Sequence, residues 1–146
     1  MSTPSLAAAD RYFQEAIKPH VDNQQVIYVG EVDHAGKVEL LSGAMAMFFF
    51  PAYGESCPLV VLESLACGTP VLGIASGPVP ELVTDGLTGF LVPDAPAMAQ
   101  AIAKIGQLDR KAIRRIAVER FDISRMVDDY LRLYETVISG KVAANC

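Results

Sequence analysis

The sequence predicts an α/β fold, in which a parallel sheet of about four strands is covered by helices on both faces. Short apolar segments alternate along the chain with segments that have the periodicity of helices. The apolar segments are also uninterrupted by polar residues, as strands buried on both faces are. The 146 residues have the length of one domain and are enough to bury a core.

The first half of the chain contains two expected helices and two expected strands. Residues 7–19 have apolar side chains close to helical spacing and end at a proline, which predicts an amphipathic helix. The β-branched run at residues 26–29 is typical of a buried strand. A second helical pattern covers residues 37–45, and the continuous apolar run at residues 46–50 predicts the next strand.

The second half of the chain begins with a helix that runs from Pro58 to about residue 67, because proline is favoured at the first position of a helix. Residues 71–74 and 89–92 are short apolar runs and predict two further strands. Between these strands we expect a helical turn at residues 78–83 and a turn at residues 84–86.

The C-terminal part of the chain is expected to be helical. Asp94 and Asp122 are of the residue type that caps helix N-termini. The basic residues between positions 110 and 120 are interspersed with acids and predict a solvated helix face. Residues 140–146 are small and polar, and we expect them to fray. The three helices expected here cover residues 96–107, 110–120 and 123–138.

Composition excludes several classes of protein. The net charge is -5, so the chain offers no basic surface for nucleic acid. The sequence has neither a signal peptide nor the ~20 consecutive apolar residues of a membrane span. Its three cysteines lack the spacing of metal ligands, and Cys57 and Cys67 lie at opposite ends of a predicted helix. We therefore expect reduced thiols, no bound metal and a cytoplasmic location.

Two acids eight positions apart are the candidate functional residues. Glu55 lies in a loop bounded by glycine and proline, and Glu63 lies inside a strongly apolar helix. Burying an unpaired carboxylate is costly, so Glu63 requires a partner. A hydroxyl-rich ligand is one such partner, and an arginine or lysine of another helix is an alternative. Glu55 can equally be a solvated loop charge.

The position of these acids favours a ligand that contains phosphate. Residues 51–58 follow an apolar strand, and in parallel sheets ligands collect at the carboxyl ends of the strands. A helix that begins at Pro58 directs its free N–H groups and positive dipole end toward this place. The arrangement suits a sugar nucleotide, with the helix N-terminus for the diphosphate, Glu63 for the ribose and Glu55 for the transferred sugar.

The segment Glu55-x7-Glu63, followed by Ser-Leu-Ala-Cys-Gly-Thr-Pro-Val71, resembles the signature of the retaining glycosyltransferase group 1 family, which has the GT-B fold. The similarity continues through residues 77–92 and covers roughly residues 8–139. It implies that residues 1–146 form a single partial domain with a Rossmann-like sheet, the C-terminal donor-binding half of a GT-B enzyme. By this resemblance the N-terminal half, which binds the acceptor, is missing.

The resemblance also implies roles for individual residues. Glu55 is the catalytic candidate and contacts hydroxyls of the donor sugar, while Glu63 binds the ribose diol. The loop that ends at Val32 lies near the base, and neither a metal nor a cofactor is required. The segment from Ser56, a candidate helix cap, to Val60 completes the donor site, with backbone N–H groups near Cys57, Leu59 and Val60 facing the sugar and the diphosphate.

The sequence also departs from this family. Cys57 and Pro58 stand where the family has an aromatic residue and glycine, and the family's basic pair for the diphosphate is absent. We therefore expect weak nucleotide affinity, and either a remnant four-stranded sheet or a homodimer that covers the exposed sheet edge. The missing N-terminal domain is expected to be supplied by a partner chain.

Three functions follow from the sequence. The first is a retaining glycosyltransferase, of which this chain binds the nucleotide-sugar donor. The alternative is a non-catalytic remnant that serves as a nucleotide-sugar-binding or oligomerisation module. A dinucleotide-binding domain is disfavoured, because no Gly-x-Gly-x-x-Gly follows a strand.

Overall fold

A computed structural model describes residues 6–50 and 56–140 of the chain. Within these residues, three parallel strands form one sheet in the order β1–β2–β3. Met47 of β1 lies beside Val71 of β2, which in turn lies beside Gly89 of β3. The sheet confirms the predicted α/β class. The strands are β1 (Met47–Phe49), β2 (Val71–Ile74) and β3 (Gly89–Val92).

Helices cover both faces of this sheet. Neighbouring residues of a strand point to opposite faces, so the contacts of Val71 and Leu72 report on one face each. On one face Val71 packs in a core with side chains of α3 (Leu59–Ala66), α4 (Val79–Leu82) and α6 (Arg110–Phe121). On the other face Leu72 packs against α5 and the 3₁₀ helix η3. The prediction of a sheet covered on both sides is therefore confirmed. The second layer consists of α5 (Ala95–Ala101) and η3 (Ile102–Gln107).

The predicted helices agree with the structure to within a few residues. The helix predicted to begin at Pro58 begins one residue later, at Leu59. Pro58 has an extended backbone and is the N-cap. Asp94 and Asp122 cap α5 and α7 as expected, each through a backbone N–H that donates to the side chain. The remaining helical elements are α1 (Leu6–Tyr12), the π-helix η1 (Phe13–Ile17), the 3₁₀ helix η2 (Lys18–His20), α2 (His34–Gly43) and α7 (Ile123–Ile138).

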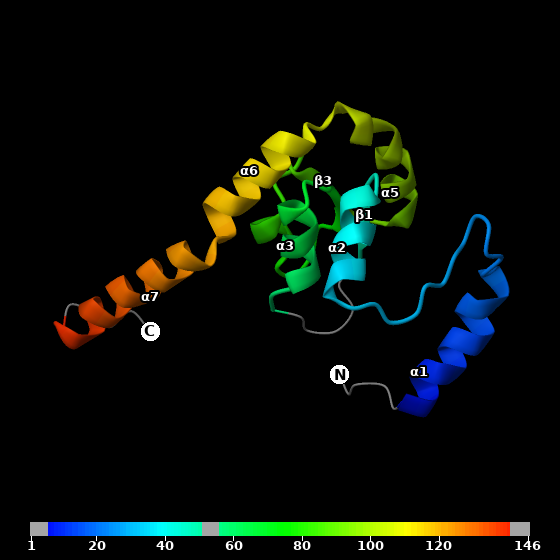
Figure 1. The fold of residues 1–146 in the computed structure, drawn as a ribbon, viewed down its shortest axis with the longest axis horizontal. Helices are drawn as coiled ribbons and strands as arrows, with labels where there is room; N and C mark the ends of the chain where they lie inside the picture. Colours follow the sequence, from blue (N-terminus) through cyan, green and yellow to red (C-terminus); the bar gives the residue numbers. More distant parts are fainter. Residues whose placement is uncertain (1–5, 51–55, 141–146) are drawn as a thin grey trace.

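The prediction of a strand at residues 26–29 is wrong, so the described sheet has three strands rather than about four. These four side chains are between 46% and 62% exposed. The carboxylate of Asp22 accepts hydrogen bonds from the N–H groups of Val26 and Gln24, which lower its pKa. The Tyr28 ring packs on Phe13, with 4.9 Å between the ring centroids. Local contacts thus hold this segment beside the N-terminal helices, apart from the sheet (Figure 1).

The face of α6 that was predicted to be solvated also contacts neighbouring helices through three of its arginines. Arg110 donates to the carbonyl oxygen of Ser42 in α2, at 2.7 Å. Arg114 donates to a carbonyl in the last turn of α3 at 2.8 Å, and Arg120 to one in α4 at 2.7 Å. Helix C-terminal carbonyls lack partners within their own helix and carry partial negative charge. The arginines of α6 therefore fasten the ends of three helices.

The last helix, α7, extends away from the sheet (Figure 1). It has no buried residue, and nine of its apolar side chains, between positions 123 and 138, are 46% to 85% exposed. None of the helices described here is both long and apolar enough to span a membrane. Of residues 140–146, which were predicted to fray, residues 141–146 lie outside the described residues.

Candidate functional site

The N-terminal turn of α3 lies at the carboxyl end of the sheet, because α3 follows β1 and leads back to β2. Leu59 and Val60 occupy the first two helical positions, whose N–H groups have no acceptor within an α-helix. Among the described residues no side chain caps this end of α3, so the expected cap by Ser56 is wrong. The backbone donors of this turn are thus placed to bind an anion.

The exposure of α3 differs between its two sides. Val61 and Leu65 are completely buried against the sheet. Leu59 is 66% exposed, and the side chain of Glu63 is 36% exposed. Leu59 and Glu63 are four residues apart and therefore lie on one helix face, a turn apart along the axis. A helix that is apolar nearly all round thus buries one face and leaves the face with the acid accessible.

An ion pair joins Glu63 to the neighbouring helix α2. The ammonium Nζ of Lys37 lies 2.6 Å from Oε1 of Glu63 and donates a hydrogen bond to it. Lys37 is the fourth residue of α2, and Asp33 caps the N-terminus of this helix. The structure therefore shows the alternative that the sequence left open, a lysine of another helix. Because about a third of each side chain is exposed, the pair contributes about 1 kcal/mol or less to stability.

The ion pair leaves acceptor capacity on Glu63. The contact with Lys37 is through Oε1, and a carboxylate has two oxygens that can each accept more than one hydrogen bond. Glu63 can therefore accept from ligand hydroxyls while it remains paired.

Two open cavities lie where α3 meets α6 and α7. The smaller, of about 280 Å³, is lined by Glu63 and by side chains of all three helices. The larger, of about 490 Å³, is lined mainly by residues of the α6–α7 junction, together with Leu62. Apolar side chains dominate its wall, namely Leu62, Phe121, Met126, Tyr130 and Leu133.

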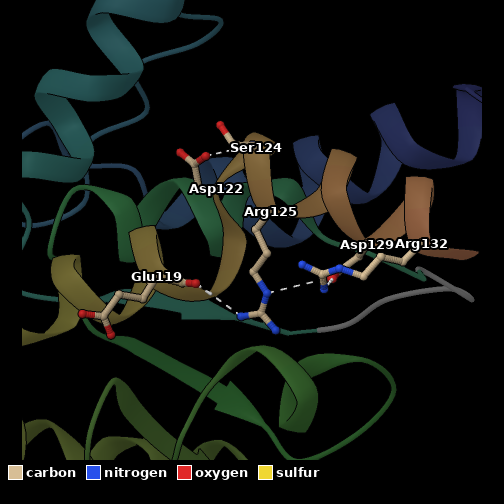
Figure 2. Close-up of polar contacts among 6 residues, drawn as sticks. All are labelled: Glu119, Asp122, Ser124, Arg125, Asp129 and Arg132. Carbon is tan, nitrogen blue, oxygen red and sulfur yellow. Dashed lines mark hydrogen bonds and ion pairs between the residues drawn. The ribbon is translucent and has the colours of Figure 1, made fainter.

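The polar groups of the larger cavity hold the α6–α7 junction together (Figure 2). The carboxylate of Asp122 accepts a hydrogen bond from the N–H of Ser124 at 2.8 Å, and hydrogen bonds from this backbone N–H and from the Ser124 hydroxyl lower the pKa of Asp122. Arg125 donates to the carbonyl of Glu119 at 3.3 Å and lies 3.6 Å from Asp129. These groups serve the junction itself, so Glu63 and the first turn of α3 are the better ligand candidates.

The structure brings together some of the predicted site residues. Ser56, Cys57, Leu59 and Val60 are exposed around the start of α3, and Glu63 follows one turn later. Cys57 is a free thiol, and so is Cys67. Val32 is 44% exposed and lies just before α2, the helix that carries Lys37. Glu55 is among residues 51–55, which lie outside the described residues.

Lys37 is the site residue that sequence reasoning missed. The sequence indicated that Glu63 needs a partner, but it contains 12 lysines and arginines, and no spacing rule selects one across helices. In the described parts of the chain, no three His, Cys, Asp or Glu side chains lie close enough to hold a metal ion.

Comparisons with known proteins give the same family. The sequence pattern of the family described as "Glycosyl transferases group 1" matches residues 5–107. A phosphatidyl-myo-inositol mannosyltransferase of Mycobacterium leprae is 32% identical over 124 residues, which cover 80% of this chain and 33% of the relative. An N-acetyl-alpha-D-glucosaminyl L-malate synthase of Bacillus anthracis is 32% identical over 135 residues, 84% of this chain and 34% of the relative. The chain thus spans about a third of the length of these relatives.

Solved structures confirm the fold. Sucrose-phosphate synthase from Thermosynechococcus elongatus is 30% identical with a TM-score of 0.72, over 95% of this chain and 37% of that one. AviGT4, a glycosyltransferase involved in avilamycin A biosynthesis, has a TM-score of 0.69 over 94% of this chain and 42% of its own. At 24% identity, the second likeness concerns the fold alone.

Proposed function

Since the chain belongs to the glycosyl transferases group 1 family, we propose that it binds the nucleotide-diphosphate-sugar donor of a glycosyltransferase. The observation that carries this proposal is the accessible carboxylate of Glu63, held by Lys37 one turn beyond the free N-terminus of α3. The transfer proceeds with retention of configuration, and residues 1–146 supply the donor-binding part. The acceptor is bound by a further domain or a partner chain.

Each part of the donor has a proposed contact in this arrangement. The N–H groups of Leu59 and Val60 and the positive end of the α3 dipole bind the diphosphate. Glu63 accepts hydrogen bonds from the ribose diol, and the loop at Val32 lies against the base. Glu55, with Ser56 and Cys57, contacts the transferred sugar. Leu59 and Glu63 share a helix face, which matches the adjacency of diphosphate and ribose in a nucleotide.

The chemistry of this site needs no metal ion. The phosphate charges are balanced by backbone donors and a helix dipole, and the ribose is recognised by a carboxylate. We therefore propose that a chelator such as EDTA leaves donor binding unchanged.

Calorimetric titration tests the proposal. UDP, GDP and ADP, with their sugar derivatives, are titrated into the chain and into Glu63→Gln, which removes the charge at nearly constant volume. We expect one nucleotide series to bind, and Glu63→Gln to weaken it about 10-fold or more, the loss of a charge-assisted hydrogen bond. Glu135→Gln on the exposed helix α7 is the matched control and leaves the affinity unchanged. Equal affinity of the chain and Glu63→Gln would refute the ribose contact.

A second candidate function is an oligomerisation module, and the exposed apolar face of α7 favours it. Contiguous exposed apolar surface marks interaction sites in soluble proteins. In this case light scattering shows the mass of a homodimer for the wild-type chain. The Leu131→Glu variant has the mass of a monomer. A monomeric wild-type chain over the whole concentration range would exclude this function.

A further inference from the structure

We propose that Lys37 is a positioning residue, whose ammonium group holds the Glu63 carboxylate in the orientation that recognises the ribose diol of the nucleotide. This inference rests on the proposed function, since it assigns a role to Lys37 within the same donor site. Its direct support is the 2.6 Å contact between Lys37 Nζ and Glu63 Oε1. These two residues are 26 positions apart in the sequence, and their contact joins α2 to α3.

The contact restricts a side chain that is otherwise free to move. A glutamate has several rotatable bonds, and ordering it when a ligand binds costs conformational entropy. Because Lys37 occupies Oε1 before the ligand arrives, part of that cost is already met, and the second oxygen remains available for hydroxyl groups. The expected consequence is tighter and more selective binding of a diol.

Lys37 is itself held on a helix that is fastened at both ends. At the N-terminus of α2, Asp33 accepts a hydrogen bond from the N–H of Gly36 at 2.8 Å, and its carbonyl accepts from the N–H of Lys37 at 2.9 Å. At the C-terminus, Arg110 donates to the carbonyl of Ser42 at 2.7 Å. A functional side chain is oriented more reliably from such a fixed element than from a loop.

The loop that follows α3 links these two helices as well. The hydroxyl of Thr69 donates to the carbonyl of Leu41 in α2 at 2.5 Å. The carbonyl of the same Thr69 accepts a hydrogen bond from the buried hydroxyl of Ser64 in α3, at 3.0 Å. Glu63 and Ser64 are neighbours in α3, so the helix carrying the acid and the helix carrying the lysine are tied by two routes.

A role in positioning differs from a role in stability. The pair is about one-third exposed, and pairs of that exposure contribute little to folding. It differs also from direct binding of phosphate by Lys37. A phosphate contact strengthens the binding of every nucleotide, whether or not its ribose carries hydroxyls. Discrimination between a ribonucleotide and its 2′,3′-dideoxy counterpart therefore isolates the proposed role.

The test measures this discrimination by calorimetry on the whole chain. UDP, GDP and ADP are each compared with the corresponding 2′,3′-dideoxynucleoside diphosphate, and the ratio of the two dissociation constants is determined. We expect a ratio of roughly 10 or more for the wild type, because a charge-assisted hydrogen bond is lost in the dideoxy compound. Lys37→Met lowers the ratio several-fold toward unity, while Lys37→Arg, which keeps the ion pair, retains it. Lys104→Met on the exposed surface of η3 is the control and changes nothing.

A double-mutant cycle completes the test. If Lys37 acts through Glu63, the ratio in the double variant Lys37→Met/Glu63→Gln equals that of Glu63→Gln alone. A wild-type ratio near unity, or no nucleotide binding at all, overturns the ribose contact and this inference with it. A discriminating wild type whose ratio survives Lys37→Met, or a Lys37→Met variant that weakens both nucleotides equally, overturns the inference alone.

Discussion

At the scale of single residues, close approaches of the backbone restrict two of the described positions, Gly68 and Gly89, to glycine. Gly89 of β3 lies so close to Val71 of β2 that a Cβ atom there would overlap the Val71 carbonyl oxygen. This carbonyl belongs to the central strand and cannot move without disturbing the ladder. Gly89 therefore sets the spacing of β2 and β3.

We expect Gly89→Ala to lower the free energy of unfolding by about 3 kcal/mol, the upper end of the usual cost of overpacking, because the obstacle is backbone. The measurement is urea denaturation followed by circular dichroism. Gly106→Ala is the control, since a Cβ at Gly106 meets no atom within 4 Å. Equal stability of the two variants would show that β2 and β3 are farther apart than described here.

We predict that the stability of α7 depends on pH, because Asp122 caps this helix. Hydrogen bonds from the backbone N–H and hydroxyl of Ser124 lower its pKa below the ordinary value of 3.8. A carboxylate with a lowered folded pKa stabilises the folded form above the unfolded pKa, and this contribution is lost as the pH falls through the folded pKa.

The far-UV circular dichroism of the wild type and of Asp122→Asn checks this expectation. Asparagine also caps helices but carries no titrating charge. The wild type is therefore the more helical of the two at about pH 7, and the difference shrinks as the pH falls below 3.8 and through the lowered pKa of the folded form. A difference that stays constant with pH would mean that the Asp122 charge does not stabilise α7.

Residue-scale features were the hardest to predict from the sequence. The sequence indicated that Glu63 requires a partner, and it allowed both a ligand and a basic residue. Identification of Lys37 required the packing of α2 against α3, which no local pattern contains. Ser56 was expected to cap α3 because of its residue type, yet Pro58 occupies the N-cap position and Ser56 makes no capping hydrogen bond.

At the scale of elements, α6 acts as a clamp on the ends of α2, α3 and α4. Arg110 is the most connected of its arginines. It donates to the carbonyls of Ala44 and Ser42 and to the hydroxyl of Thr69, at 2.5, 2.7 and 2.7 Å. These groups are acceptors at the end of α2 and at the start of the segment that leads into β2.

We expect Arg110→Met to lower the free energy of unfolding by about 2 kcal/mol, because partly buried acceptors lose their donors. Methionine retains much of the aliphatic volume, so the effect reports the hydrogen bonds. Lys111→Met, one residue further and exposed, is the control and stays within about 0.5 kcal/mol. Chemical denaturation measures both, and equal stabilities would contradict the clamp.

Most of the elements themselves were predictable. The runs at residues 71–74 and 89–92 and the helix at residues 123–138 have the bounds that the sequence predicted. Their signals are unambiguous, because turn residues bound the strands and Asp122 caps the helix. The run at residues 26–29 has equal β propensity, but no strand lies beside it within residues 6–50 and 56–140, and the carboxylate of Asp22 accepts a hydrogen bond from the N–H of Val26. Propensity describes suitability for a sheet and does not supply a partner.

At the scale of the whole molecule, the core is confined to the sheet and the helices around it. Residues 6–33 and the helix α7 lie apart from that core and leave large apolar side chains exposed (Figure 1). The fold class and the family could be predicted from the sequence, because alternating elements and the motif around Glu63 extend over most of the chain. The arrangement of these two outlying segments could not, because it depends on contacts that the chain's own pattern does not specify.

The central claim is that a sugar nucleotide binds at the first turn of α3. Nuclear magnetic resonance tests it most directly, by mapping changes in backbone amide shifts when UDP, GDP or ADP is added to the labelled chain. We predict the largest changes at residues 59–63 and at residues 32–37, with little change in α5 and η3. Largest changes in the cavity of the α6–α7 junction, at Phe121 and Arg125, would contradict the claim.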